Sequence, residues 1–153
     1  MSTTPSNPAK PSKPEDFPGL VGEEFVGDWF TQSPERQQQF YLGTYLDETY
    51  GESMDQAYPE GLVEGFNQLG LLDYLSAEII GRWHGYNYGL DRVRFLTPLT
   101  VRDRIRLRLR VETVAERGNG FLVKYDTTLE IEENPKPAMI AQWLVLLLPV
   151  HSL

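Results

Sequence analysis

Cysteine is absent from this sequence of 153 residues, and histidine occurs only twice. Without cysteine the chain has no disulfide bond, no thiolate nucleophile and no cysteine-ligated metal, which fits a protein of the reducing cytoplasm. Two histidines are too few for a histidine-based metal site. We therefore expect a cytoplasmic protein that uses no metal and no other cofactor.

Basic residues are in the minority, and long hydrophobic runs are missing. The chain has 14 lysines and arginines against 22 aspartates and glutamates, a formal net charge of −8. Such a charge repels nucleic acid and anionic membrane surfaces. The longest apolar run near the C-terminus, residues 143–149, has the length of a strand and is too short to cross a bilayer. The first residues also lack the basic start and apolar run of a signal peptide. Neither nucleic acid nor a membrane is expected as a partner.

Proline is concentrated at the start of the chain. Residues 1–18 hold five of the eleven prolines, with serine, threonine and lysine between them. This composition predicts a disordered tail, because it buries too little apolar surface to offset the entropy of ordering. A docking peptide for a partner is the alternative. Residues 19–153 suffice for one domain, and the 41% of hydrophobic residues supply its core.

Two helices are predicted before the strands begin. Ser33, followed by proline and glutamate, is typical of a helix start, and this helix is expected to run to about Leu46. Residues 47–61 contain two glycines and a proline and are interpreted as a loop. Apolar residues then recur at three- and four-residue spacing over residues 62–80, which predicts a second helix closed by Gly81. This apolar stripe consists of Leu62, Phe66, Leu69, Leu72, Leu75 and Ile79.

The second half of the chain has the alternation of antiparallel strands. In residues 105–111 aliphatic side chains alternate with arginines at positions 106, 108 and 110, and a fourth arginine, Arg104, directly precedes them. A Gly-Asn-Gly turn at residues 118–120 predicts a hairpin, and strands follow at residues 121–131 and 137–149. The order of elements predicts an α+β domain in which a curled antiparallel sheet wraps around a long central helix. We interpret the arginines as a solvated face paired with acidic neighbours; the alternative is that one or two bind a phosphate-rich carrier.

Two motifs link the chain to a known family. One is WHGYNYGLDRVRFLTP at residues 83–98, and the other is PAMIAQWLVLLLP at residues 137–149. They resemble the MaoC-like branch of the hot-dog fold, the (R)-specific enoyl-thioester hydratases and dehydratases. In that branch one strand reads roughly NYG-x-x-[KR]-VRF-x-x-P and the last strand reads roughly PA-x-x-A-[EQ]-WL. The matching residues are Asn87, Tyr88, Gly89, Val93, Arg94, Phe95 and Pro98, then Pro137, Ala138, Ala141, Gln142, Trp143 and Leu144.

The resemblance covers residues 20–149 and implies a single hot-dog domain. It also implies a homodimer with the cleft between subunits, because family members close the open sheet edge by two-fold association. The substrate that it implies is an acyl-CoA, an acyl-carrier-protein thioester or a free polyketide-like small molecule.

The catalytic motif of this family is altered here. Its members use an aspartate and a histidine spaced D-x-x-x-x-H as general acid and base, and a backbone amide at the start of the central helix holds the thioester oxygen. Counted without gaps, these two residues fall on Leu46 and Gly51; with one inserted residue they fall on Asp47 and Glu52. Where the family has His-Gly, this chain has Glu64-Gly65.

The predicted catalytic residues are Glu64, Asp47 and His84. Glu64 would be a general base beside the substrate carbonyl, or only an acidic residue that complements the helix dipole. Asp47 would be its partner, or a helix cap or solvated loop charge. His84 would supply an imidazole from a new position, or lie on the surface. The predicted substrate-binding residues are Gly65, Glu52, Tyr86, Asn87 and Tyr88, where packing is the alternative for the two tyrosines.

Three functions remain open at this point. The first is a lyase that adds or removes water, or closes a ring by the same proton transfers, in specialised biosynthesis. The second is a hot-dog thioesterase with Glu64 as base, since hot-dog thioesterases also use an acid on this helix. The third is a non-catalytic subunit that supports an active hot-dog partner.

Overall fold

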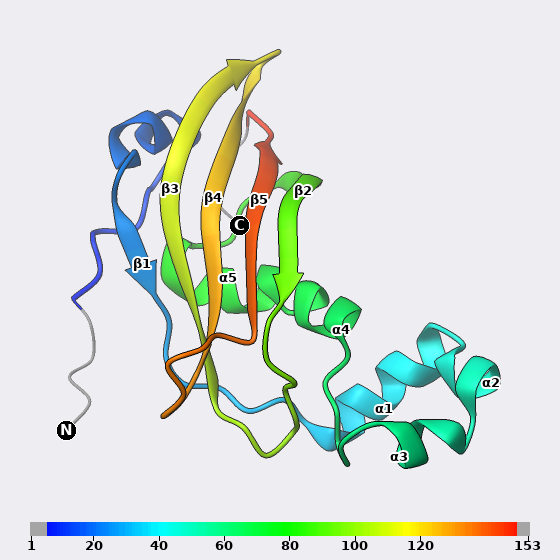
Figure 1. Cartoon of the computed structure of the whole chain (residues 1–153). Coiled ribbons are helices and arrows are strands. Elements are labelled where there is room, and N and C mark those ends of the chain that lie inside the picture. Colours follow the sequence, from blue (N-terminus) through cyan, green and yellow to red (C-terminus); the bar gives the residue numbers. More distant parts are fainter. Residues whose placement is uncertain (1–5, 150–153) are drawn as a thin grey trace.

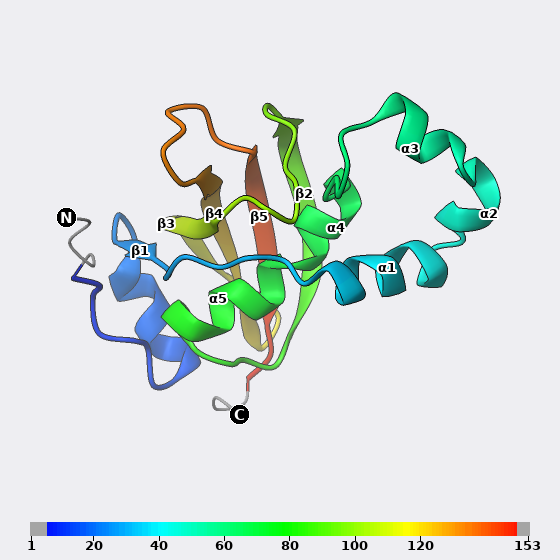
Figure 2. The same ribbon diagram turned by 90° about the horizontal axis from the view of Figure 1, so that it is seen from below.

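Five antiparallel strands form one curled sheet in the order β1-β3-β4-β5-β2 (Figure 1). In the computed structural model, which describes residues 6–149, the central helix lies across the concave face of this sheet (Figure 2). The strands are β1 (Glu24–Val26), β2 (Gly85–Phe95), β3 (Ile105–Arg117), β4 (Gly120–Ile131) and β5 (Met139–Leu147). This arrangement confirms the predicted α+β hot-dog architecture.

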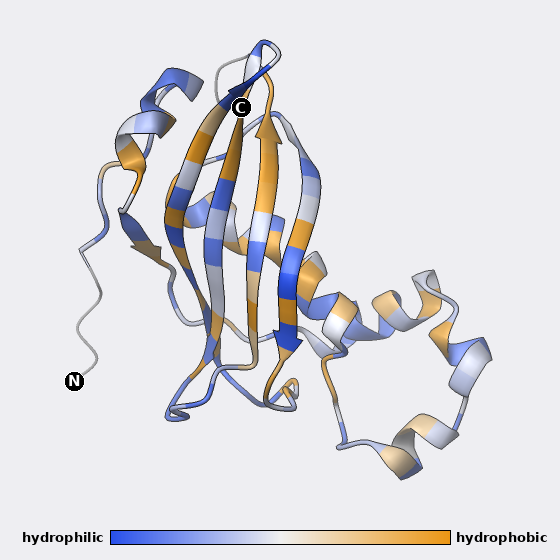
Figure 3. Cartoon of the chain, turned by 45° about the horizontal axis from the view of Figure 1, so that its top comes forward, coloured by the Kyte–Doolittle hydropathy of each residue, from blue (hydrophilic) through white to orange (hydrophobic). Residues whose placement is uncertain are grey.

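The alternation along β3 divides the sheet into a core face and a solvent face, as the sequence predicts. Its aliphatic residues Ile105, Leu107, Leu109 and Val111 are all buried, while the arginines between them face outward. The same banding of hydrophobic and hydrophilic residues runs along the neighbouring strands (Figure 3). Each fully buried aliphatic side chain contributes about 1.5–3 kcal/mol to folding, so this face anchors the domain.

The predicted helix over residues 62–80 is divided into α4 (Gly65–Gly70) and α5 (Leu72–Ile80). At the junction the amide of Leu71 is shared between the carbonyls of Asn67 and Gln68, which tightens the turn and changes the face that the helix buries. The predicted stripe is therefore correct along α5 but wrong at Phe66, whose side chain is 71% exposed. Gly81, with φ of 97°, ends α5 as expected.

Residues 6–18, the described part of the predicted disordered tail over residues 1–18, pack on the domain, contrary to that prediction. A 3₁₀ helix, η1 (Pro14–Leu20), inserts the fully buried Phe17 edge-on against Trp83, with ring centroids 5.1 Å apart. Upstream, the side chain of Asn7 exchanges two 2.8 Å hydrogen bonds with the backbone of Val26. The average composition of the segment conceals one large apolar residue whose burial offsets the ordering entropy. Residues 1–5 lie outside the described part of the chain.

Three short helices form an arm that extends away from the sheet (Figures 1 and 2). They are α1 (Pro34–Gly43), α2 (Leu46–Tyr50) and α3 (Ser53–Ala57), and together we call them the helical arm. Ser33 caps α1 as predicted, accepting a hydrogen bond from the amide of Arg36. The helix ends before Leu46 because Tyr45 adopts a left-handed conformation with φ of 61°. The predicted loop over residues 47–61 thus contains two helices.

The helical arm is thinly packed. Gln37 is the one buried residue of α1, and α2 has none. Several of its apolar side chains remain exposed, namely Leu42, Tyr45 and Tyr50. Across residues 6–149, no helix combines the length and apolarity that a bilayer span requires.

Candidate active site

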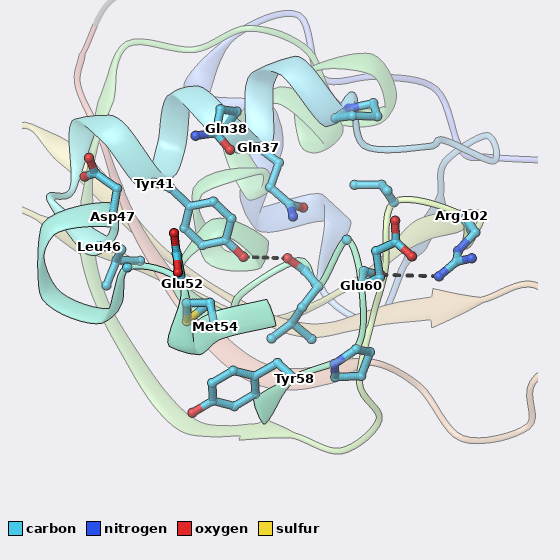
Figure 4. Close-up of a pocket in the computed structure, with 16 residues that line it drawn as sticks. Gln37, Gln38, Tyr41, Leu46, Asp47, Glu52, Met54, Tyr58, Glu60 and Arg102 are labelled. Carbon is cyan, nitrogen blue, oxygen red and sulfur yellow. Dashed lines mark hydrogen bonds between the residues drawn. The ribbon is translucent and has the colours of Figure 1, made fainter. Parts of the chain in front are cut away.

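A pocket of about 630 Å³ opens between the helical arm and the chain that leads into α4 (Figure 4). Its walls are the inner side of the arm, residues 58–62, and residues 101 and 102. A short backbone ladder fixes the second wall: the amide of Val63 donates to the carbonyl of Leu99 at 2.7 Å, and that of Val101 donates to Gly61 at 2.9 Å. The pocket is therefore held against the start of the central helix.

Asp47 and Glu52 both line this pocket and have the five-residue spacing of the family's acid and base. Asp47 lies in the first turn of α2, and Glu52 follows Gly51, whose φ of 51° reverses the chain between the two carboxylates. Leu46 and Gly51, the residues of the ungapped alignment, also line the pocket but have no ionisable group. Both carboxylates are exposed in the single chain.

Buried amides behind the pocket are the feature that the sequence did not predict. Gln32, Gln37, Asn67 and Gln68 are all buried, and Gln37 also lines the pocket. Gln32 donates to Asn67 at 3.1 Å, and Gln68 donates to the carbonyl of Val63 at 3.1 Å. Within the described residues, Oε1 of Gln37, Nδ2 of Asn67 and Oε1 of Gln68 are buried without a hydrogen-bond partner. An orphaned buried polar atom is costly, so this cluster is suited to a polar guest such as water or a substrate oxygen.

Tyr41 contributes a second polar group to the same wall. Its hydroxyl donates to the carbonyl of Leu62 at 2.8 Å and ties α1 to the chain before α4 (Figure 4). Gln37 and Tyr41 are one helical turn apart and therefore lie on the same side of α1. No pattern in the sequence distinguishes these residues from other polar helix positions.

Glu64 and Gly65 lie at the start of α4, next to the pocket but outside its lining. Glu64 is half-buried, and its carboxylate accepts a 3.0 Å hydrogen bond from the amide of Phe66 as the cap of the helix. The ring of Phe95 packs on Gly65 so closely that a Cβ there would lie 2.8 Å from a ring carbon. This contact explains the glycine by packing, and it connects the end of β2 to the helix start.

His84 does not lie beside Glu64 in this chain. It is exposed and precedes the first residue of β2, whereas Phe95, which packs on Gly65, is the last. Ten residues of strand separate these ends by roughly 30 Å. Within one subunit His84 is therefore too far away to act with Glu64, and its catalytic role stays a prediction.

Tyr86, Asn87 and Tyr88 also lie at the far end of β2. Asn87 accepts a 2.9 Å hydrogen bond from the indole of Trp143, and the guanidinium of Arg117 lies 4.6 Å from the ring of Tyr88. A bulge between Asn87 and Gly89 interrupts the register with β5. Tyr86 and Asn87 line a second, smaller pocket, so the predicted site is divided between the two ends of the central helix.

Arg104, just before β3, and the three arginines on β3 at positions 106, 108 and 110 all form ion pairs with acidic neighbours, as interpreted from the sequence. The ion pairs join Arg104 to Glu132, Arg106 to Glu130, Arg108 to Glu130 and Glu24, and Arg110 to Asp126. Burial alone would raise the pKa of Glu130, but hydrogen bonds from Arg108 and Arg106 outweigh it and hold that pKa below its usual value. This face gives no support to the alternative of a phosphate site.

Comparison with known proteins identifies the family. The chain is 30% identical over 148 residues to "Nodulation protein N" of Rhizobium leguminosarum bv. viciae, covering 86% of this chain and 89% of that protein. It is 35% identical over 140 residues to "3-hydroxyacyl-thioester dehydratase Z" of Mycobacterium tuberculosis, covering 85% and 92%. A MaoC-like dehydratase from Rhodospirillum rubrum superposes with a TM-score of 0.65 at 11% identity, covering 85% and 93%. A scan against protein-family models gave no match.

The fold and these relatives together define a class of protein, the hot-dog dehydratases and hydratases. The chain belongs to the MaoC-like family within that class. The family resemblance of the two sequence motifs is thereby confirmed.

Proposed function

We propose that the protein is a lyase of specialised biosynthesis that adds water to, or removes it from, an acyl thioester or a related polyketide-like intermediate. The observation that carries this proposal is that Asp47 and Glu52, at the family's acid–base spacing, line one pocket beside the start of the central helix. The 35% identity to a protein named as a 3-hydroxyacyl-thioester dehydratase supports the reaction class. Ring closure by the same proton transfers is the variant of this chemistry that the pocket would also support.

Glu64 is the proposed general base. It follows Leu62, which lines the pocket, by two residues, so about 7 Å of chain separates them at most. The amides of the first helical turn lack intrahelical acceptors, and that of Gly65 is the proposed donor to the thioester oxygen. In hydration the base takes a proton from water while the oxygen bonds to the β-carbon, and an acid delivers a proton to the α-carbon. Dehydration is the reverse, with Asp47 as the partner of Glu64 and Glu52 in contact with the substrate.

A second copy of the chain completes the proposed site. β2 pairs only with β5 in the described residues, so the backbone groups of its other edge are unpaired, and its side chains Tyr86, Leu90 and Phe95 are exposed. An open apolar strand edge is normally covered, and an antiparallel two-fold pairing would cover it in a homodimer. The same association would exclude water from Asp47 and Glu52, which are exposed in the single chain.

The test is turnover of a trans-2-enoyl-CoA, followed by loss of the absorbance of the conjugated thioester. Glu64→Gln keeps the shape and removes the base, so it should lower the rate about 10²–10⁴-fold with the fold intact. Asp47→Asn should cost less, and Glu48→Gln, on α2 but outside the pocket lining, should cost nothing. Full turnover by Glu64→Gln would show that the proposed base is wrong. Release of free thiol from the same substrate would instead favour a thioesterase.

A non-catalytic partner subunit is the second candidate. One observation favours it: the pocket lining contains no imidazole within the described residues. For this candidate, all the variants above should be silent in the pure protein. Activity would then depend on a different hot-dog chain.

A further inference from the structure

A second pocket lies at the opposite end of the central helix from Glu64. It has a volume of about 340 Å³, within the range of small-molecule sites, and is an open pocket lined by α5, the linker to β2, and strands β2, β4 and β5. Four aromatic side chains form much of its wall, Trp83, Tyr86, Tyr125 and Trp143, with the aliphatic side chains of Ile80, Val145 and Leu147 between them. Such a lining favours an apolar ligand body.

A chain of hydrogen bonds fixes the polar side of this pocket. The indole of Trp143 donates to Asn87 at 2.9 Å, which orients the amide so that its nitrogen donates to the Asp73 carboxylate at 3.0 Å. Both partners of Asn87 lie in other elements, β5 and α5, so the network joins sheet to helix. Asp73 is thus held at the pocket, and its carboxylate can accept further hydrogen bonds.

Tyr125 lines the same pocket and is only 3% exposed. Its ring packs against Trp143, with centroids 5.6 Å apart. Within the described residues the side-chain hydrogen bond to Tyr125 is to its backbone carbonyl, from Thr127, and its hydroxyl has none. Burial raises the pKa of this phenol, so it stays neutral and can both donate and accept. This hydroxyl is not among the fully buried atoms without a partner, so it opens to the pocket, where a ligand can bond to it.

We propose that this pocket binds an apolar group carrying a hydroxyl, which donates to Asp73 and accepts from Tyr125. A neutral hydroxyl fits better than a cation, because Arg82 also lines the pocket and offsets the charge of Asp73. Asp73 follows Gly65 by about 12 Å along the helix. In substrate terms, which rest on the proposed function, the acyl group is then a hydroxylated chain or ring and not a plain aliphatic one.

Binding of small fragments to the full chain tests this without any turnover. The three tryptophans provide the signals, since the indole N–H groups of Trp83 and Trp143 lie at this pocket and that of Trp29 does not. In ¹H–¹⁵N spectra, benzyl alcohol should shift the first two signals saturably and leave Trp29 unmoved. Toluene lacks both hydrogen bonds and should bind about 25-fold more weakly. Equal binding of toluene, or tighter binding of benzylamine, would overturn the hydroxyl assignment.

Tyr125→Phe removes only the phenol oxygen and should weaken benzyl alcohol about fivefold while leaving toluene unchanged. Tyr74→Phe makes the same change on α5, beside Asp73 but outside the pocket lining, and as the control it should alter neither. Unchanged alcohol binding in Tyr125→Phe would refute the site. A protein that binds the alcohol but hydrates no thioester would keep this pocket and lose the proposed function, so the two failures are distinguishable.

Discussion

Phe17→Ala should destabilise the protein severely, although residue 17 lies in a segment whose composition is that of a disordered tail. Phe17 is fully buried and packs edge-on against Trp83. Removing a buried phenylalanine costs about 3–5 kcal/mol, which is a large part of the 5–15 kcal/mol that stabilises a typical domain. With a urea m-value of about 2 kcal/mol per molar, the midpoint of unfolding should fall by roughly 2 M. Equilibrium urea unfolding followed by tryptophan fluorescence measures this shift.

Val21→Ala is the matched control, since Val21 is also apolar and follows the same 3₁₀ helix but is 51% exposed. It should change the free energy of unfolding by less than about 0.5 kcal/mol. Deleting residues 2–16 should lower the melting temperature by several degrees, because it removes Asn7 and the buried Pro14. A Phe17→Ala variant as stable as the control would mean that the segment is not docked, and the reasoning would fail.

Two further predictions concern charge and buried polarity. The arginine partners of Glu130 lower its pKa in the folded state, so its contribution to stability is complete above its unfolded pKa of about 4.3 and is lost as the pH falls through the lowered pKa. When stability is measured against pH in acid, the Glu130→Gln variant should lose less stability than the wild type. An unchanged pH profile would contradict the assignment. Gln37→Met removes a buried carbonyl oxygen that has no hydrogen-bond partner, so the free energy of unfolding should rise by about 1 kcal/mol in urea titrations. Turnover should nevertheless fall about tenfold. A loss of both stability and activity would indicate a purely structural role.

The fold was predictable because its signals are local and repeated. Alternation over residues 105–111 marks a half-buried strand whatever the rest of the chain does. The Gly-Asn-Gly turn sets the hairpin, and Gly118 has the positive φ that such a turn requires. The two fold predictions that were wrong, the disordered tail and the unbroken central helix, each depend on single residues. In the proline-rich segment a single phenylalanine is fully buried, and at Leu71, where the amide is shared between two carbonyls, the central helix divides into α4 and α5.

The site was less predictable, because its composition depends on contacts between distant segments. The spacing of Asp47 and Glu52 could be counted, and both line one pocket. The burial of Gln37 could not be foreseen, since it arises where α1 crosses the chain before α4 and leaves no periodic signal. The sequence also suggested that His84 and Glu64 act together, whereas in one chain they lie at opposite ends of β2.

The proposed two-fold pairing would give His84 a different role, which can be tested. If the axis passes through the middle of β2, antiparallel pairing sets the start of one strand against the end of its mate. His84 of one subunit then lies at the end of β2 where Phe95 of the other packs on Gly65, beside Glu64. The imidazole missing from the pocket would come from the second copy.

Mixing two inactive variants distinguishes this arrangement from one in which each subunit works alone. Glu64→Gln and His84→Ala should each be inactive, and both should sediment as dimers at micromolar concentration. In a mixed dimer, one site carries both substitutions and the other carries neither. Random reassortment makes half of the dimers mixed, so about a quarter of wild-type activity should return after the variants are unfolded and refolded together. No recovery, with mixed dimers demonstrated by mass, would mean that His84 does not act across the interface, and a stable monomer would exclude the interface itself.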